Sequence, residues 1–590
     1  MTIAVRLPGL EHWLAQVKCQ SACPVRTDSG LYAQLIAQGR YDAAYEEIRR
    51  PNPFASVCAR VCAAPCEDAC RRKTLDAPVA LRALKRFVTE RCGVESLHPV
   101  GMPRTTPRRN APRVAVVGAG PAGMSAAAEL ANYGYQVTIF EAESEPGGMM
   151  RFGIPEYRLP RSVIRGEVER IREMGVHFEL NHPLTASFGL AELRAAGFAA
   201  VFLSVGVSKG RDLQMPGSEL DGVVKAIDYL LNVNRGFRMD LGRNVVVIGG
   251  GFVAFDAART ALRVSCEADL DVLADVASES EAALKEAFDS ARAAIRGGAA
   301  HVTIVSLENF DEMPVLRSTQ GHEEFEEAKH EGVVFVTRRG PKKFVGDRRL
   351  QAIELRRVVS VFDENGRFAP AYDDNDIVTI VADACILAIG QGANLSFIKP
   401  SDGMTLRPAG TIAVDRATLA TSAPGVYAGG DVAFGPRNLI EAVANGQLAA
   451  RSIHRYISGD DPAALPLEIL AERIPILRYE MPEDYELLER ESPPTVELDR
   501  RTGIAEVEIG YDEAAARRQA ARCLVCHVET IYDGESCVAC GRCVDVCPEA
   551  CLELVPLNAV GLGLAERNAL TESAASFGPH LAAMIKDDDR

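Results

Sequence analysis

The 590-residue sequence lacks several features that define common protein classes. It contains no run of about 18 to 20 apolar residues, which a membrane-spanning helix requires. Its start has no basic stretch followed by an apolar core, so no secretory signal is predicted. The 65 basic residues are outnumbered by 81 acidic ones, and the net charge of -16 disfavours contact with the phosphates of DNA or RNA. We therefore expect a cytoplasmic protein with no membrane span and no nucleic-acid partner.

Cysteine, in contrast, is abundant and unevenly placed. Of the 16 cysteines, 13 fall in two short zones, residues 19–70 and 523–551. A disulfide framework is typical of small secreted domains, whereas clustered cysteines in a large chain indicate metal or cluster ligands and a reducing compartment. The other three, Cys92, Cys266 and Cys385, are isolated, and we interpret them as small buried apolar residues.

A β-α-β pattern begins at Arg113 and carries a glycine-rich turn. The segment GAGPAG places Gly118, Gly120 and Gly123 at G-x-G-x-x-G spacing between a predicted strand and a predicted helix. The first glycine allows a tight turn, the second lets the backbone approach a pyrophosphate, and the third lets the helix lie close to the strand. Glu141, at the end of the next predicted strand, is placed to bind ribose hydroxyls. A glycine turn without a ligand is the alternative, and the strand-turn-helix context disfavours it.

The pattern recurs at Asn244, where GGGFVA gives Gly249, Gly251 and Ala254, the variant that ends in alanine. A helical insert, residues 268–296, follows before the next strand. Two such units in one chain predict two bound nucleotides, commonly FAD and a nicotinamide. A later segment, PGVYAGGDV, places Asp431 directly after a short predicted strand. In flavoprotein reductases with two nucleotides, this pattern brings an aspartate to the flavin, so we expect an FAD domain that is split around the nicotinamide domain.

Together with EPGGMMRFGIPEYRLP, DEMP and GVYAGGDVAFGPRNLIEAVANGQLAA, these motifs resemble the glutamate synthase small-subunit family of FAD/NAD(P) iron–sulfur flavoproteins. The N-terminal region of dihydropyrimidine dehydrogenase and the large subunit of bifurcating ferredoxin:NADP reductase belong to the same group. The resemblance covers roughly Cys19 to Ile457. It implies iron–sulfur clusters near the N-terminus and a nicotinamide at Gly249, Gly251 and Ala254. It also implies FAD held by Gly118, Gly120, Gly123, Glu141, Gly148 and Asp431.

The predicted fold class is α/β, with two Rossmann-like dinucleotide-binding domains. An α-helical iron–sulfur domain precedes them and a ferredoxin-like segment follows. The expected order is a helical iron–sulfur domain (1–100), a linker (101–112), the first segment of the FAD domain (113–240), an NAD(H)-binding domain with a helical insert (241–375), the second segment of the FAD domain (376–460), a connector (461–520), a ferredoxin-like iron–sulfur segment (521–560) and a tail (561–590).

The choice between NAD and NADP depends on the strand before the E-M-P motif. NADP carries an extra phosphate that requires Arg or Lys, whereas a carboxylate accepts the free ribose hydroxyl of NAD. Family members usually end this strand with two arginines, and the matching positions here are Leu307 and Glu308. Glu308 lies 59 residues after Gly249, instead of about 20, because the insert lengthens this unit. We predict NAD ahead of NADP; the alternative is a solvated glutamate in a loop.

The C-terminal zone contains CVACGRCVDVCP, the C-x-x-C-x-x-C-x-x-x-C-P spacing of bacterial ferredoxins. This spacing predicts that Cys537, Cys540, Cys543 and Cys547 bind 4Fe–4S clusters, and it makes a zinc site improbable. No second copy of the motif follows. Either the chain continues beyond residue 590, or the coordination is completed by Cys523, Cys526 and Cys551. Cys523 and Cys526 resemble a pair that the family more often carries at its N-terminus.

The N-terminal zone supplies six further candidate ligands, and it lacks the family's leading C-x-x-C. They are Cys19, Cys23, Cys58, Cys62, Cys66 and Cys70. One cluster or two can be held here, so the chain as a whole is expected to bind at least two 4Fe–4S clusters, with cysteines for three or four.

Hydride transfer between a nicotinamide and a flavin requires alignment of two rings, so no catalytic acid or base is predicted. The leading hypothesis is an NAD(H)-linked FAD iron–sulfur subunit that passes electrons to or from a large catalytic subunit or a ferredoxin-type subunit. The partner would belong to a larger oxidoreductase, such as one acting on a 2-oxoacid or coupled to ferredoxin. Two alternatives remain open: an NADPH-dependent glutamate synthase small subunit, and a stand-alone NAD(P)H:ferredoxin oxidoreductase.

Overall fold

The computed structural model describes residues 3–4, 17–101, 110–237, 239–263, 299–460, 487–501, 503–526 and 560–561. The chain divides into two compact units. The larger is Cys19–Leu524, and the smaller combines Met1–Lys18 with Val525–Arg590. In the smaller unit, strand β1 (Ile3–Ala4) pairs in parallel with strand β17 (Val560–Gly561).

The N-terminal region of the larger unit is helical, as predicted. Its elements are α2 (Lys18–Ala22), α3 (Ser29–Ala37), α4 (Tyr41–Arg49), α5 (Ala55–Val61), α6 (Pro65–Asp68), the 3₁₀-helix η1 (Arg71–Thr74) and α7 (Leu81–Cys92). The carboxylate of Asp28 starts α3 by accepting a hydrogen bond from the Leu31 amide at 2.9 Å. Gly39, with φ +77°, then ends that helix. The helices enclose a core that includes Tyr32 and Phe87.

A five-stranded parallel sheet forms the next domain. Its strand order is β16-β5-β2-β3-β4. The strands are β2 (Arg113–Val117), β3 (Gln136–Phe140), β4 (His177–Glu179), β5 (Phe198–Leu203) and β16 (Val426–Ala428). Because β16 comes more than two hundred residues after β5 in the chain and still pairs with it, this domain is split, as the sequence predicted.

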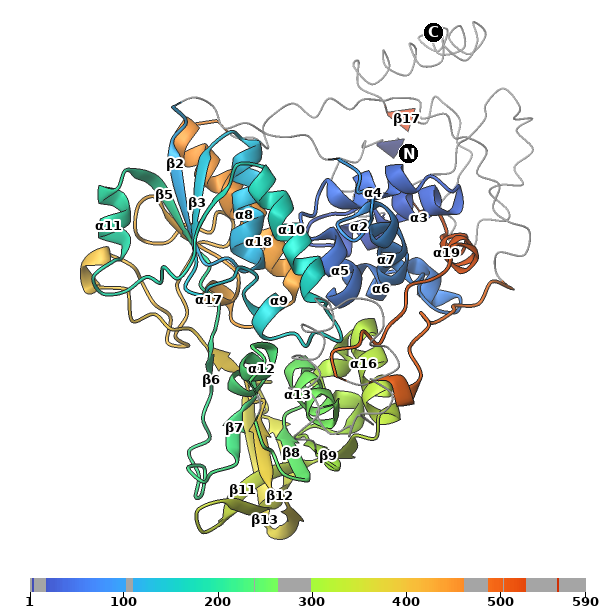
Figure 1. Ribbon diagram of the computed structural model, residues 1–590, viewed down its shortest axis with the longest axis vertical. Helices are drawn as coiled ribbons and strands as arrows, with labels where there is room; N and C mark the ends of the chain where they lie inside the picture. Colours follow the sequence, from blue (N-terminus) through green and yellow to red (C-terminus); the bar gives the residue numbers. More distant parts are fainter. Residues whose placement is uncertain are drawn as a thin grey trace, which may run out of the picture. The chain divides into compact units, whose positions relative to one another are not determined.

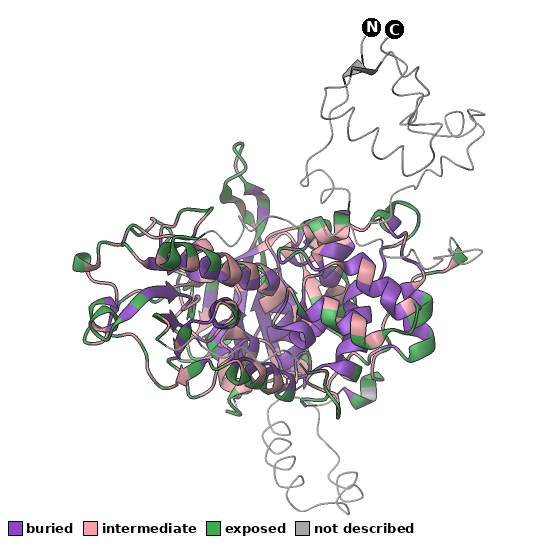
Figure 2. Ribbon diagram, turned by 90° about the horizontal axis from the view of Figure 1, so that it is seen from above, coloured by how far each residue is buried: buried purple, intermediate pink, exposed green. Residues whose placement is uncertain are grey.

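Helices cover both faces of this sheet (Figure 1). Successive strand residues point to opposite faces, so Val114 and Val116 pack on one side and Ala115 and Val117 on the other. The first side is covered by α8 (Pro121–Asn132), α10 (Arg161–Glu173) and α18 (Leu439–Ser458), and the second by α11 (Leu190–Ala195). Figure 2 shows the buried residues gathered in the strands and on the inner faces of the helices.

A second parallel sheet has the strand order β10-β9-β8-β14-β7. Its strands are β7 (Val223–Lys225), β8 (Asn244–Ile248), β9 (His301–Val305), β10 (Val334–Val336) and β14 (Ala384–Leu387). Its helices are α12 (Ala226–Asn234), α13 (Phe252–Arg263) and α16 (Thr319–His330). This domain is wider than the predicted range 241–375, because β7, α12 and β14 join its sheet and core.

Two smaller sheets accompany the second domain. Strands β11 (Arg339–Gly346), β12 (Leu350–Phe362) and β13 (Phe368–Val381) form an antiparallel sheet. Strands β6 (Lys209–Gly210) and β15 (Gln391–Gly392) pair where the chain enters and leaves the second domain. The remaining short elements are α9 (Met149–Phe152), α17 (Asp431–Phe434) and the 3₁₀-helices η2 (Phe310–Glu312), η3 (Pro314–Arg317) and η4 (Pro400–Asp402).

The described residues of the predicted connector return to the N-terminal helices. They contain η7 (Leu498–Arg500) and α19 (Glu513–Ala520), and α19 packs against α3 and α7. None of the helices in the described ranges has the length and apolar character needed to cross a bilayer.

Candidate functional site

The first glycine turn has the geometry that a dinucleotide requires. Gly118 adopts φ +102°, and a side-chain carbon there would lie 2.5 Å from the carbonyl oxygen of Ser204. A side-chain carbon at Gly123 would overlap the carbonyl oxygen of Gly118. Beside Gly120, in contrast, no atom lies within 4 Å of the position that such a carbon would take. The backbone is therefore tight at the first and third glycines and open at the second, where a pyrophosphate would approach.

Glu141 follows β3 and lies against this turn. Its Oε2 accepts a hydrogen bond from the Ala119 amide at 2.6 Å, and its Oε1 accepts one from the Glu143 amide at 2.9 Å. The side chain is buried, and this burial raises the pKa of Glu141 above its usual range. The carboxylate thus stands beside the turn, where ribose hydroxyls could replace one of its amide donors.

Two distant segments meet the same turn. A side-chain carbon at Gly148 would lie 2.8 Å from the Cα of Gly120, and one at Gly430 would lie 3.2 Å from the Cβ of Ala122. Asp431, the first residue of α17, follows directly, and burial raises its pKa to about 6. The structure therefore brings the glycine turn, Glu141, Gly148 and Asp431 into one site at the start of α8.

The second glycine turn repeats this arrangement. Gly249 has φ +137°, and a side-chain carbon there would lie 2.5 Å from the carbonyl oxygen of Ala388. No atom lies within 4 Å of the corresponding position at Gly251, so the middle of this turn is open. Ala254 is completely buried in α13, where its amide donates to the Gly251 carbonyl at 2.9 Å. A small residue is required at this third position because the helix lies close to the sheet.

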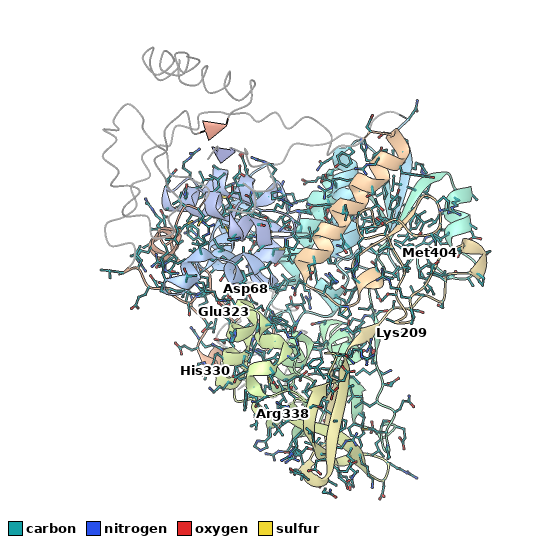
Figure 3. The ribbon with its side chains drawn as sticks, turned by 180° about the vertical axis from the view of Figure 1, so that it is seen from behind. Asp68, Lys209, Glu323, His330, Arg338 and Met404 are labelled. Atoms are coloured by element: carbon teal, nitrogen blue, oxygen red, sulfur yellow. The ribbon has the colours of Figure 1, made fainter. Side chains whose placement is uncertain are left out.

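Glu308 lies at the mouth of the second turn. Its Oε2 accepts a hydrogen bond from the Ser306 hydroxyl at 2.6 Å and would lie 3.5 Å from a side-chain carbon at Gly250. The backbone carbonyl of Glu308 accepts a hydrogen bond from the Arg338 amide at 3.2 Å. The guanidinium of Arg338, which is labelled in Figure 3, pairs with Glu312 at 3.1 Å. The predicted helical insert, residues 268–296, lies outside the described residues, and Glu308, which follows it, lies beside the second glycine turn.

Four cysteines of the N-terminal zone interact with one lysine. Cys23, Cys58, Cys62 and Cys66 are all buried, and all four interact with the buried ammonium of Lys85. Burial alone would lower the pKa of Lys85, but the four thiols hold it above its usual range. A hydrogen bond from the Cys58 thiol lowers the pKa of Cys62 to about 6. A thiolate is the form that binds iron, so the donor set fits an iron–sulfur cluster.

The other two cysteines of this zone, Cys19 and Cys70, pack half-buried against the core of the helical domain. Cys523 is buried in that same core, and Cys526 is half-buried. The predicted ferredoxin-like ligands lie outside the described residues: Cys537, Cys540, Cys543, Cys547 and Cys551. Cys92 and Cys385 are buried, as expected of small apolar residues.

Comparison with protein families shows the family to which the chain belongs. Residues 112–446 match the family described as pyridine nucleotide-disulphide oxidoreductase, which is more than half of the chain. The chain belongs to this family. Residues 14–96 match dihydropyrimidine dehydrogenase domain II, 4Fe-4S cluster, and residues 530–553 match a 4Fe-4S binding domain. This member of the pyridine nucleotide-disulphide oxidoreductase family is therefore an FAD-dependent NAD(P)H oxidoreductase with iron–sulfur domains on both sides of its nucleotide-binding domains.

The names of the relatives of this oxidoreductase specify different nicotinamide nucleotides. The beta subunit of NADP(+)-dependent formate dehydrogenase from Moorella thermoacetica is 34% identical, covering 86% of this chain and 70% of that protein. The NAD-dependent dihydropyrimidine dehydrogenase subunit PreT from Escherichia coli O157:H7 is 32% identical, with coverage of 75% and 91%. The small chain of glutamate synthase [NADPH] from Azospirillum brasilense is 30% identical, with coverage of 77% and 89%. The family thus includes both NAD- and NADP-dependent enzymes, and all three relatives are named as subunits or chains of larger enzymes.

Sequence reasoning missed two polar groups of these sites. Lys85 is one basic residue among three in LRALKRF, and nothing in that pattern shows that its ammonium faces cysteines. Ser306 directly follows β9 and fixes the carboxylate of Glu308. A serine two residues before an acid at the end of a strand is a signal that could have been read, because such a hydroxyl can hold the acid in place.

Proposed function

We propose that this chain is the NADH-linked electron-transfer subunit of a larger oxidoreductase. The observation that carries this proposal is the carboxylate of Glu308, held by Ser306 at the mouth of the second glycine turn. A carboxylate there accepts hydrogen bonds from the free ribose hydroxyls of NADH. It repels the additional phosphate of NADPH.

A basic residue whose backbone amide donates to the Glu308 carbonyl supports the same choice. Arg338 could offer a guanidinium to a phosphate, but it pairs with Glu312 at 3.1 Å. Leu307, which precedes Glu308, carries no charge. The local charge at the end of β9 is therefore negative or neutralised, and this favours the nucleotide that lacks the phosphate.

The residues of the first site fit FAD. The open backbone at Gly120 and the start of α8 would receive the pyrophosphate, Glu141 would bind ribose hydroxyls, and Asp431 would lie near the remainder of the cofactor. Bound FAD supplies the exchange between a two-electron hydride and single electrons. The polypeptide positions the two nucleotides, and no side chain is required as an acid or a base.

We further propose that electrons pass between the iron–sulfur clusters and a partner, either a large catalytic subunit or a ferredoxin-type subunit. Three observations support this: matches to 4Fe-4S domains on both sides of the flavoprotein, the subunit names of the relatives, and the absence of a recognisable pocket motif for an organic substrate in the sequence. An oxidoreductase that acts on a 2-oxoacid or is coupled to ferredoxin is the kind of partner that we expect in the cytoplasm.

The test is anaerobic mixing of the holoprotein with NADH and, separately, NADPH, while flavin bleaching is followed by stopped-flow absorbance. We expect rapid bleaching by NADH and bleaching by NADPH that is at least about tenfold slower at equal concentration, equivalent to about 1.4 kcal/mol. Faster bleaching by NADPH would overturn the proposal and favour a function like that of the glutamate synthase small chain.

A substitution at Glu308 tests whether this residue is the selector. In Glu308→Arg we expect the preference for NADH to fall at least about tenfold and the rate with NADPH to rise. Glu364→Gln removes an exposed carboxylate from the turn between β12 and β13 and serves as the control, with unchanged preference. If both variants keep the wild-type ratio of the rates with NADH and NADPH, Glu308 does not select the nucleotide.

A further inference from the structure

The number of cysteines in the N-terminal zone does not match two complete clusters. A 4Fe–4S cluster bound by cysteine alone takes four thiolates, so two clusters need eight, and residues 19–70 supply six. Four of these cysteines gather around Lys85. Cys19 and Cys70 remain, and two thiols cannot complete a second cluster of this type.

A candidate for one of the missing thiols lies at the other end of the larger unit. Cys523 is only 9% exposed and belongs to the buried core of the helical domain, together with Cys66. Cys19 and Cys70 pack against this same core. Cys523 is thus placed with the N-terminal cysteines although more than four hundred and fifty residues separate it from Cys70 in the chain.

Two buried arginines fix this placement. The guanidinium of Arg522 is completely buried and donates to the carbonyls of Ala77 at 2.8 Å and Pro78 at 3.0 Å. It also pairs with the carboxylate of Asp76 at 2.6 Å. Arg72 pairs with Asp76 at 2.7 Å and donates to the backbone carbonyl of Arg522 at 3.5 Å. Asp76 therefore links Arg522, the residue before Cys523, to Arg72, which lies two residues after Cys70.

Helix α19, which precedes Cys523 in the chain, holds it in this position. Its buried residues Ala516 and Ala520 lie in the core of the helical domain, and the Cys523 amide donates to the Ala520 carbonyl at 3.1 Å. The carboxylate of Asp512 caps the start of the helix by accepting from the Ala515 amide at 2.7 Å. The segment is a folded component of the helical domain. Cys92, the other described cysteine of this core from outside the N-terminal zone, donates its thiol to the Asp42 carboxylate at 3.4 Å.

We propose that Cys523 binds an N-terminal 4Fe–4S cluster together with Cys19 and Cys70. Cys523 thus supplies a third thiolate beside Cys19 and Cys70. In this assignment, Cys523 does not serve the ferredoxin-like motif that begins at Cys537. The inference holds whether the nucleotide is NADH or NADPH.

A 4Fe–4S cluster and a single metal ion differ in how far apart their ligands lie. Among the residues that the structure describes, no group of three or more His, Cys, Asp or Glu side chains converges on one metal ion. In a 4Fe–4S cluster each thiolate binds a different iron, so its ligands lie farther apart than the four around one zinc ion.

The experiment compares the iron content and the EPR spectrum of anaerobically purified full-length variants. We expect Cys523→Ala to lose about four irons per chain and one reduced-cluster signal, as Cys19→Ala and Cys70→Ala should. Because all three would disrupt one cluster, the double variant Cys523→Ala/Cys70→Ala should lose no more iron than either single variant. Cys92→Ala, which alters an isolated buried cysteine of the same core, is the control and should keep its iron.

A second set of variants distinguishes a ligand of the N-terminal cluster from a ligand of the ferredoxin-like motif. In a chain that already carries Cys537→Ala, Cys540→Ala and Cys543→Ala, adding Cys523→Ala should still remove about four further irons. If iron does not fall further there, or if the losses in Cys523→Ala and Cys70→Ala add, Cys523 serves another cluster and the proposal is overturned.

A folding control accompanies every variant. Bound flavin and its bleaching by NADH should stay near wild type, because the nucleotide sites lie in other domains. Should Cys523→Ala lose flavin, Cys523→Val fills a similar volume without a ligand atom and is measured in the same way. Wild-type iron in this valine variant would overturn the proposal, and loss of one cluster with flavin retained would support it.

Discussion

Lys85 is an unusual residue for the interior of a helical domain. Lysine is almost never fully buried unless it is paired, and here its ammonium interacts with four cysteines, Cys23, Cys58, Cys62 and Cys66, whose thiolates in a cluster would balance its charge. A 4Fe–4S cluster with four thiolate ligands carries net negative charge. A buried ammonium beside these thiols would offset that charge, and it would do so more strongly once the cluster is reduced.

This arrangement leads to a prediction at the scale of one residue. Lys85→Met keeps the apolar stem and removes the charge, so we expect the reduction potential of the cluster held by these thiols to fall by about 60 mV, equivalent to about 1.4 kcal/mol for one electron. An EPR-monitored redox titration of the holoprotein measures this shift. Lys73→Met, which removes an exposed lysine of the same domain, should leave the potential unchanged. An unchanged potential in Lys85→Met would mean that the ammonium does not act on the cluster.

Residue-level prediction from the sequence succeeded where a spacing implies a geometry. The glycines of the first turn could be assigned because a turn, a close approach and helix packing each require a residue without a side chain. Glu308 could be proposed from its place after a strand. The cysteines near Lys85 could not be predicted in the same way, because they depend on which side chains face each other after the helices have packed.

At the scale of elements, the close approach of α18 to α8 determines the shape of the first site. Gly446 makes this possible: a side-chain carbon there would overlap the carbonyl oxygen of Ala122 and lie 2.7 Å from the Ala126 amide nitrogen. These are backbone atoms, so α8 could not move out of the way without opening the glycine turn. Asn445, the neighbouring residue on α18, accepts a hydrogen bond from the Gly430 amide at 3.0 Å.

We therefore expect Gly446→Ala to lower both stability and flavin content. Overpacking of this kind typically costs about 1 to 3 kcal/mol. Thermal unfolding and the ratio of flavin to protein measure the two effects. Gly392→Ala is the matched control, because its backbone is not in the left-handed region and no atom lies within 4 Å of the added carbon. Equal flavin content in the two variants would show that the helix contact does not support the FAD site.

The elements themselves were largely predictable from sequence periodicity. Strands β2, β3, β8 and β9 appear where apolar runs were bounded by turns. Apolar residues recur at helical spacing through residues 31–50, yet this stretch forms two helices, because Gly39 takes a left-handed conformation that sequence periodicity does not reveal. The boundaries of the second domain differ from the predicted range 241–375 for another reason. Strands β7 and β14 are short, and only sheet pairing shows which domain they join.

At the scale of the larger unit, charged residues connect the helical domain, the second dinucleotide-binding domain and the connector. Asp68 of α6 accepts hydrogen bonds from the amide and the hydroxyl of Thr319 at 2.8 and 2.6 Å, at the start of α16. Glu323 of α16 pairs with Arg82 at 3.0 Å and with Arg490 of the connector at 2.9 Å. Figure 3 shows Asp68 and Glu323 close together where these elements meet.

Glu331 holds a buried region of this network. Its carboxylate pairs with Arg259 at 2.7 Å and Arg501 at 3.1 Å and accepts a hydrogen bond from Arg263 at 2.9 Å. Burial opposes its charge, but the hydrogen bonds from Arg259 and its neighbours lower the pKa of Glu331 to about 2. A carboxylate whose pKa is depressed on folding stabilises the protein above its unfolded pKa, near 4.5, and this contribution is lost as the pH falls toward 2.

We expect Glu331→Gln to destabilise the protein by about 3 kcal/mol, because three guanidinium groups lose a buried partner. Between pH 5 and 8 the carboxylate stays ionised, so the difference in melting temperature between variant and wild type should be constant. Thermal unfolding at several pH values in this range checks both expectations. Glu326→Gln, on the exposed side of α16, is the control and should have little effect. A difference that shrinks toward pH 5 would mean that Glu331 titrates within this range.

The placement of α19 on the N-terminal helices has a consequence for the synthesis of the chain. A domain normally folds soon after it leaves the ribosome, but the core of this helical domain includes Ala516 and Ala520 of a segment made at the far end of the larger unit. At about 5 to 20 residues per second, the 430 residues between Cys92 and Arg522 take roughly 20 to 90 seconds to translate. During this interval the nascent N-terminal helices expose the surface that α19 will cover. Their maturation therefore waits for the two dinucleotide-binding domains to emerge first.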